Sequence, residues 1–277
     1  FGAFATDGAS MVIWTLLFIA INTLIVCGGV GGGIEKFCNV GMPCLFVILI
    51  IVIVYVAVQP GAVGGYQFMF GLNIDPLKED FLGVLKTAAG QMFFSLSLGM
   101  GAMITYGSYL GKKQNLEKNA LIIVIMDTLI ALMAGLAVMP GRFALDASGA
   151  VGGPKLLFIT MQNVFDKMGA IGPVFGLLFY LLVVFAAISS SISLLEVIVA
   201  HFCDKARIAG KGDKRKAYSL IAAVAVGLGC TLVCLDCLGG AGIAPADLLK
   251  IEASGWSDCW LDFFDCISEG ILMPLGA

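Results

Sequence analysis

QMFFSLSLGMG, residues 91–101, lies in the middle of the long apolar run Leu85–Leu110. It places two serines and a Gly-x-Gly pair, Gly99 and Gly101, where a membrane-crossing segment would be at mid-depth. Closely spaced glycines weaken a helix, and backbone carbonyls freed inside a bilayer must face a ligand, water or other protein. Small residues also let neighbouring helices pack closely. The stretch therefore predicts either a broken spanning helix or a small-residue packing face.

The composition of the whole chain supports a membrane setting. Hydrophobic residues make up 60% of the 277 residues and charged residues 13%, against about 45–50% and about 25% in soluble domains. The mean hydropathy is +1.01. The net charge is only −3, and no basic tract suggests a nucleic-acid partner. These values predict an all-α, polytopic membrane helical bundle in a lipid bilayer, and not an enzyme, because no nucleophile triad, P-loop or dinucleotide fingerprint occurs.

Six apolar runs reach the roughly 20 residues that a spanning helix needs. They are Met11–Gly29, Val40–Val58, Leu85–Leu110, Ala120–Met139, Ile171–Phe202 and Tyr218–Leu235. A seventh run begins near Phe263 and stays incomplete at residue 277. The chain has no initiator methionine, so we interpret it as one transmembrane domain, residues 1–277, cut at both ends from a longer protein.

The distribution of lysine and arginine predicts the orientation. The loops after the first, third and fifth runs hold ten of the sixteen basic residues, six of them between residues 205 and 216. Short loops rich in basic residues face the cytoplasm. The first run is therefore expected to enter the membrane from outside.

Asp127 is the one ionisable residue in the six complete runs that lies well away from a span end. It follows Asn119 by eight positions, about 12 Å along a helix. A carboxylate at this depth is costly and indicates function. No run offers a buried lysine or arginine as partner, which favours a bound cation or a proton.

Two further segments depart from plain membrane helix. In the fifth run, Ala186, Ser189, Ser190 and Ser193 share one helical face; these serines either contribute oxygen ligands or bond back to their own helix. The segment from Gly33 to Pro43 either opens or kinks a helix or marks an ordinary helix entry near the interface. Polar oxygens at similar depth beside a broken helix are typical of secondary transporters.

The order of these motifs resembles the neurotransmitter:sodium symporter family, in the form of its bacterial amino-acid transporters. FFSLSLGMG, residues 93–101, with TYGSY, residues 105–109, resembles the broken sixth helix. FAAISSSISLLE, residues 185–196, resembles the eighth helix, and GIEKF, residues 33–37, the loop before the fifth. The resemblance implies two inverted five-helix repeats, with this chain running from just before helix four into helix ten. It also implies sodium-coupled amino-acid symport by alternating access across the plasma membrane, the inner membrane in bacteria.

The resemblance also assigns residues. It implies a substrate site formed by Phe94, Ser95, Ser97, Met100, Ser190 and Leu194. A first sodium site would use Ser95 and Asp127, where many relatives carry asparagine. A second sodium site would use the Ala186 carbonyl with the hydroxyls of Ser189 and Ser190. Asp265 resembles an external-gate residue, and Gly33 and Pro43 resemble a spacing at which helix five opens a water path. Both ion sites also need helix one, so we expect this chain to be inactive alone.

Several alternatives stay open. Met100, where many relatives have an aromatic residue, favours a large apolar or aromatic amino acid, because methionine repacks around bulky groups. At the position of Ala131, relatives carry a glutamate in chloride-independent transport or a serine in chloride-dependent transport. Alanine is neither, so the chloride requirement stays open. A proton-coupled carrier on the same fold would use Asp127 as its proton site. A membrane scaffold or receptor that kept the fold without transport is the remaining alternative.

Overall fold

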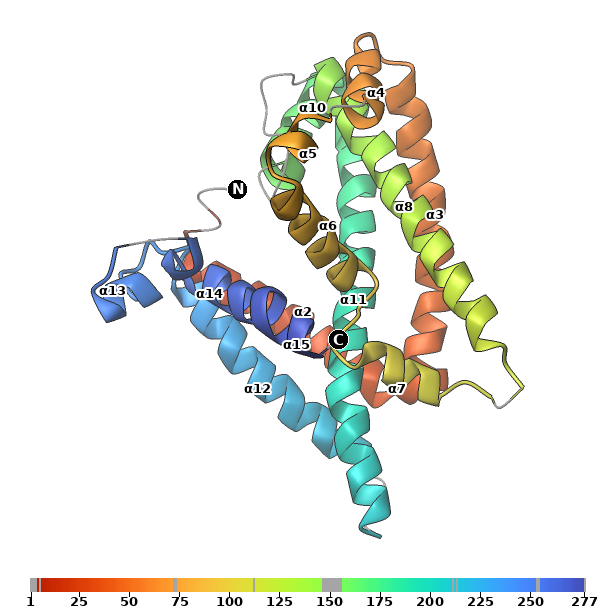
Figure 1. Ribbon diagram of the computed structural model, residues 1–277, viewed down its shortest axis with the longest axis vertical. Helices are drawn as coiled ribbons and strands as arrows, with labels where there is room; N and C mark the ends of the chain where they lie inside the picture. The colour runs from red at the N-terminus through yellow and green to blue at the C-terminus, as the bar shows by residue number, and fades with distance from the viewer. Residues whose placement is uncertain are drawn as a thin grey trace. The chain divides into compact units, whose positions relative to one another are not determined.

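The computed structural model describes residues 4, 6–71, 74–111, 113–145, 156–210, 212, 214–252 and 255–276. Those residues are almost entirely helical and contain no strand, which confirms the predicted all-α class (Figure 1). The α-helices are α2 (Gly8–Cys27), α3 (Glu35–Ala57), α4 (Ala62–Phe70), α5 (Asp75–Glu79), α6 (Phe81–Ser95), α7 (Ala102–Ser108), α8 (Leu116–Leu145), α10 (Met161–Lys167), α11 (Gly172–Ile208), α12 (Arg215–Leu235), α13 (Pro245–Leu249), α14 (Trp260–Ile267) and α15 (Met273–Gly276). Short π-helical turns lie at Val30–Ile34, Leu156–Thr160 and Ser268–Leu272, and 3-10 turns at Gly169–Ile171 and Gly255–Ser257.

Five helical stretches in the described part of the chain are long and apolar enough to cross a membrane. They are Gly8–Cys27, Val30–Ala57, Leu116–Ala144, Gly169–Ile208 and Arg215–Leu235. Each overlaps one of the predicted runs. The predicted third run, Leu85–Leu110, is divided between α6 and α7, and neither half is long enough to cross alone. Of the two interpretations of residues 91–101, the broken helix is therefore confirmed.

The contacts between residues group the chain into two compact units. The first unit contains Phe1–Phe37, Leu85–Lys112 and Ile188–Ala277, and the second contains Cys38–Val84 and Lys113–Ala187. α11 is one continuous helix that contributes residues to both. Each unit is described by itself below.

The second unit is held by a core between α3, α8 and the first turns of α11. Its fully buried members are Ile48, Leu49, Val52, Val56 and Ala137. The ring of Tyr55 packs against that of Phe175, with centroids 4.3 Å apart. α4 lies directly on α8, since a Cβ added to Gly65 would be only 2.4 Å from Pro140 Cα. These contacts place α4 and the C-terminal ends of α3 and α8 together at one end of this unit.

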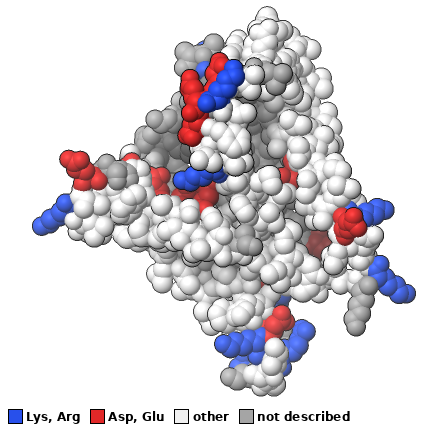
Figure 2. All heavy atoms as spheres, viewed as in Figure 1, with Lys and Arg blue, Asp and Glu red and all other residues white. Residues whose placement is uncertain are grey.

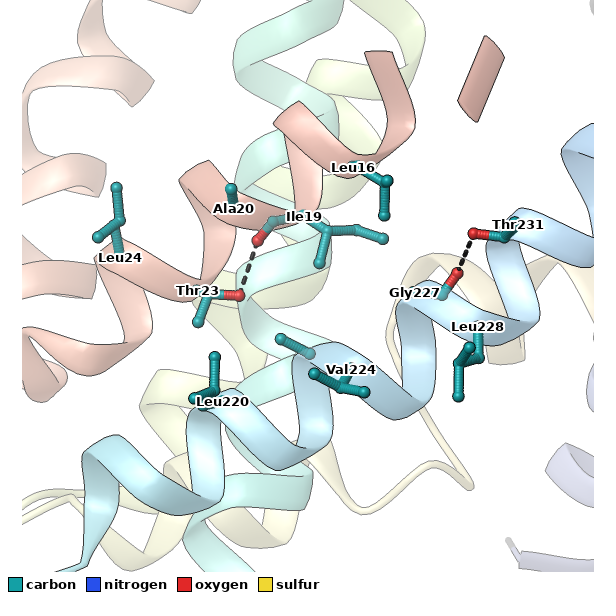
Figure 3. Close-up of a pocket in the computed structure, with 11 residues that line it drawn as sticks. Leu16, Ile19, Ala20, Thr23, Leu24, Leu220, Val224, Gly227, Leu228 and Thr231 are labelled. Carbon is teal, nitrogen blue, oxygen red and sulfur yellow. Dashed lines mark hydrogen bonds between the residues drawn. The ribbon is translucent and has the colours of Figure 1, made fainter. Parts of the chain in front are cut away.

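The first unit contains an antiparallel pair, α2 and α12. The Arg215 guanidinium, at the start of α12, donates from Nε to the Val26 carbonyl at the end of α2, at 3.0 Å. At the opposite end the Thr15 hydroxyl and the Cys234 thiol are 3.3 Å apart. The pair leaves an apolar groove along its length (Figure 3). Thus the end of α2 and the start of α12 share one side, as the charge distribution predicts.

The predicted irregularity between residues 33 and 43 takes a specific form. Gly29 has a φ of +79°, and a π-helical turn, Val30–Ile34, leads into α3. α3 continues through Pro43, which lies inside the helix. The departure from regular helix therefore lies before Glu35, at the glycines, and Pro43 removes one internal hydrogen bond without ending the helix.

Candidate functional site

The break between α6 and α7 begins with a defined helix end. The N–H of Leu98 donates to the Phe93 carbonyl at 2.8 Å, and the N–H of Ser97 donates to the Phe94 carbonyl at 3.1 Å. This is the hydrogen-bond pattern of a Schellman motif, whose penultimate residue takes the left-handed conformation. Ser97 does so, with a φ of +53°, at a position where glycine is usual. The backbone therefore turns sharply out of the helix at Ser97.

The segment that follows exposes backbone carbonyl groups. Gly99 and Gly101 have φ values of +76° and +74°, and α7 begins directly after Gly101. Among the described residues, no backbone N–H donates to the carbonyls of Leu96, Ser97 or Leu98. A carbonyl inside a bilayer without such a donor is costly unless it faces a cation, an ammonium group or water. The break thus presents several oxygens suited to a positively charged ligand.

α7 is fastened to α11 by two tyrosine hydroxyls. Tyr106 Oη donates to Ser193 Oγ at 3.0 Å, and Tyr109 Oη donates to Glu196 Oε1 at 2.6 Å. The second oxygen of the Glu196 carboxylate pairs with the Arg215 guanidinium. Glu196 has no exposed surface. The second half of the broken helix is thereby fixed to α11 and α12, within the first unit, through the buried Glu196 carboxylate.

This cluster was not among the candidate site residues derived from the sequence. In the sequence, Glu196 is the last residue of the serine-rich motif of the fifth run, and Arg215 is one of the six basic residues between residues 205 and 216. Their partners come from α7, α11, α12 and the end of α2, which are far apart in the chain. A glutamate within an apolar run could have indicated a buried charged cluster. Glu196 lies near the predicted end of the fifth run, however, where a charged side chain can reach the membrane surface and needs no partner.

Some of the serine hydroxyls on α11 already donate hydrogen bonds to groups of the protein. Ser193 donates to the Ser189 carbonyl at 2.9 Å, and Ser191 donates to Asn22 Oδ1 on α2 at 2.7 Å. Ser190, by contrast, has an exposed side chain. Back-bonding, one of the two interpretations of these serines, thus holds for Ser193.

The predicted ligands fall in both units. Phe94, Ser95, Ser97, Met100, Ser189, Ser190, Leu194, Asp265 and Gly33 belong to the first unit, and Asp127, Ala186 and Pro43 to the second. Asp127 is half-buried on α8, and the Asp265 side chain is exposed on α14. The pairing of Ser95 with Asp127, and of Ala186 with the two serines, stays a prediction.

Comparison with known proteins identifies the family. The profile of the sodium:neurotransmitter symporter family matches residues 5–273. YhdH, an uncharacterized sodium-dependent transporter of Bacillus subtilis, is 34% identical over 262 residues, covering 95% of this chain and 54% of the relative. The neutral and basic amino acid transporter B(0+) of Mus musculus, described as sodium- and chloride-dependent, is 28% identical over 265 residues, covering 90% of this chain and 40% of the relative.

A solved structure resembles the fold throughout. The crystal structure of MhsT in complex with L-phenylalanine superposes with a TM-score of 0.83 at 35% sequence identity, covering 100% of this chain and 58% of that one. The chain spans about half the length of the bacterial relatives it matches. With the family profile covering almost every residue, and with five apolar helices of spanning length among the residues that the structure describes, this chain is an integral membrane protein that belongs to the sodium:neurotransmitter symporter family.

Proposed function

We propose that this chain contributes to a carrier that couples the uptake of a large apolar or aromatic amino acid to the entry of sodium. The observation that carries the proposal is the break between α6 and α7. In the part of the chain that the structure describes, no backbone N–H donates to the carbonyls of Leu96, Ser97 and Leu98 there. An amino acid brings an ammonium group and the coupled ion a positive charge, and both are suited to such oxygens.

The proposal assigns the substrate contacts to residues of the break and of α11. The carbonyls and hydroxyls around Ser95 and Ser97 hold the amino group, and Phe94 covers the substrate. Met100 and Leu194 line the side-chain pocket, together with Ser190. The flexible Met100 side chain adapts to bulky substrates, and the phenylalanine bound to MhsT supports this choice of substrate class.

Sodium would be held by oxygen atoms alone, as suits a hard cation. The first site uses Ser95 and the Asp127 carboxylate. The second uses the Ala186 carbonyl with the hydroxyls of Ser189 and Ser190. Asp265 acts at the external gate, and Gly33 with Pro43 opens the path by which the second ion leaves. Sodium bound at these positions favours one of the two arrangements of the helical bundle between which an alternating-access carrier moves. Release of sodium favours the other arrangement.

A proton-coupled carrier is the second candidate, and a specific residue favours it. Asp127 is half-buried within an apolar helix, and its carboxyl group can exchange a proton, unlike the asparagine that many members of the symporter family carry at this position. Substrate binding that persists when sodium is replaced by potassium, but depends on pH in the parent and not in Asp127→Asn, would select this candidate.

Equilibrium binding of labelled amino acids to the full-length gene product tests both candidates. We expect one hydrophobic amino acid to bind in sodium and not in potassium. Ser190→Ala should raise the sodium concentration needed for half-maximal binding, whereas Thr231→Ala on α12, whose hydroxyl donates to the Gly227 carbonyl of its own helix, should leave it unchanged. Absence of binding to every amino acid tested would refute the proposed activity.

Met100→Phe tests the pocket assignment separately. A rigid ring in place of the flexible thioether reduces the room for bulky side chains, so phenylalanine and tryptophan should lose affinity while alanine and glycine keep theirs. An equal loss for small and large amino acids would remove Met100 from the pocket.

A further inference from the structure

We propose that the groove between α2 and α12 binds one acyl chain of an anionic phospholipid, whose headgroup contacts Lys216. The groove has a volume of about 590 Å³ and is lined by Leu16, Ile19, Ala20, Thr23, Leu24, Leu220, Ala223, Val224, Gly227, Leu228 and Thr231. All of these residues belong to the first unit. Figure 3 shows that leucine, isoleucine and valine side chains of both helices line it.

The groove presents only hydrocarbon to an occupant. Its two polar side chains, Thr23 and Thr231, bond back to their own helices: Thr23 Oγ1 donates to the Ile19 carbonyl and Thr231 Oγ1 to the Gly227 carbonyl, each at 2.7 Å. Both bonds are drawn in Figure 3. With these hydroxyls satisfied, the surface offers no further polar contact and suits an unbranched hydrocarbon chain.

Small residues make the groove deep enough. Gly227 has no side chain, and a Cβ placed there would lie 3.7 Å from Leu16 Cδ2 and 3.9 Å from Ile19 Cδ1, at van der Waals contact. A larger side chain at this position would occupy the space between the helices. By contrast, a Cβ at Gly229, two residues further along α12, would meet nothing within 4 Å.

A charged residue stands at one end of the groove. Lys216 precedes Leu220 by four residues and Val224 by eight, so all three lie on one face of α12, with Lys216 about 6 Å beyond Leu220 along the axis. Its side chain is exposed, as is that of Lys214. Arg215 is engaged with Glu196 and Val26. Lys216 is therefore placed to meet a phosphate whose acyl chain continues into the groove.

The surroundings of Lys216 have the matching charge. Lys205 and Arg207 lie in the last turn of α11, just before α12, and Figure 2 shows lysine and arginine, with an acidic side chain among them, where Figure 1 places the end of α11. Clusters of basic residues beside the cytoplasmic end of a spanning helix attract anionic lipids. Charge complementarity therefore favours an anionic over a zwitterionic lipid.

Native mass spectrometry of the delipidated 277-residue chain tests the proposal, using phosphatidylglycerol and phosphatidylcholine with identical acyl chains. We expect one phosphatidylglycerol to bind more tightly than phosphatidylcholine. Gly227→Leu should abolish this binding, and the matched Gly229→Leu should not. Lys216→Gln should weaken phosphatidylglycerol by about fivefold without affecting phosphatidylcholine, whereas Lys118→Gln, at the start of α8, should change neither.

Three outcomes would overturn the proposal. Equal binding of the two lipids would remove the headgroup contact. Equal binding to Gly227→Leu and Gly229→Leu would show that the acyl chain lies elsewhere. Loss of a dimer in Gly227→Leu with lipid binding intact would assign the groove to a second copy of the chain. Lys216→Gln changes only an exposed side chain, so its result stands even where Gly227→Leu fails to fold.

Discussion

Glu196 is a carboxylate with no exposed surface inside an apolar helix; one of its oxygens accepts from the neutral Tyr109 hydroxyl, and the other pairs with the charged Arg215 guanidinium. Burying a lone charge is far more costly than burying a pair. The contribution of the Glu196–Arg215 pair to stability is therefore measured best by removing one partner, which leaves the other charge without its counter-charge.

Arg215→Gln should destabilise the chain strongly, by about 3–5 kcal/mol, because it leaves the Glu196 charge buried and unpaired. The double variant Glu196→Gln/Arg215→Gln should recover much of the loss, since two neutral amides can bond to each other. Unfolding in a fixed detergent, followed by circular dichroism, measures both. A double variant no more stable than Arg215→Gln would contradict the buried-pair account.

The Asp7 side chain caps the first turn of α2 by accepting from the Ser10 N–H. Its hydrogen bonds from the Ser10 hydroxyl and N–H lower the pKa of Asp7 below its ordinary value of 3.8. The cap is therefore fully present above that value and is lost as the pH falls through the lowered one. We expect Asp7→Ala to speed amide hydrogen exchange of residues 8–12 at neutral pH, while Asp7→Asn, which caps without a charge, keeps protection that no longer depends on acid.

The importance of a single residue was predictable from the sequence where the hydropathy pattern alone singled that residue out. Asp127 stands out because nothing near it along the chain is charged. Glu196 could not be weighed in the same way, because its importance comes from Tyr109 and Arg215, which only the folded chain brings to it. Position along a helix is a property of sequence, whereas partnership across helices is not.

Among the helices, α15 lies against the break at two glycines. A Cβ added to Gly99 would lie 2.3 Å from the Met273 carbonyl oxygen, and one added to Gly276 would lie 2.2 Å from the Gly99 carbonyl oxygen. α15 therefore supports the break backbone to backbone, with no room for a side chain on either partner.

Gly99→Ala should cost about 1–2 kcal/mol for its positive φ alone, with the clash against Met273 in addition. Gly276→Ala has no unfavourable φ, so any loss of substrate affinity there reports the contact itself. Gly107→Ala, within α7 and in open space, serves as control and should be neutral or slightly stabilising. Equal behaviour of Gly276→Ala and Gly107→Ala in thermal unfolding and substrate binding would show that the contact has no effect.

The existence of the broken helix was predictable, but its ends were not. Serines and glycines within an apolar run indicate where a helix weakens. Only the hydrogen bonds of Leu98 and Ser97 place its end at Ser95, and they require Ser97 to adopt a conformation that its residue type rarely takes. Similarly, the glycines before Glu35 form a π-helical turn, whereas the proline at residue 43, the stronger helix breaker by type, lies inside α3.

Across the whole molecule, the charge distribution predicts which ends of the helices face the cytoplasm. Lys214→Cys, before α12, should react with an impermeant maleimide only when the cytoplasmic side is open, and Lys78→Cys, on α5, only from outside. Both side chains are exposed, and the unsubstituted chain with its nine cysteines provides the background. Labelling of both positions from one side would overturn the predicted topology.

The fold class and the number of apolar runs followed from composition and spacing, because a bilayer permits few solutions for a chain this apolar. The ion sites were less predictable from the sequence. Their expected ligands are distributed over the two units, and which oxygens would hold one ion depends on how helices pack rather than on the order of residues.

The ion pair between Glu196 and Arg215 also has a consequence for biosynthesis. During synthesis α11 emerges with its carboxylate before the arginine that neutralises it, and a lone charge within a membrane helix is costly. The connection between α11 and α12 is only a few residues long. We therefore expect the two helices to enter the bilayer together, as one hairpin, so that a nascent chain halted before residue 215 would hold α11 less firmly in the membrane than one allowed to continue through α12.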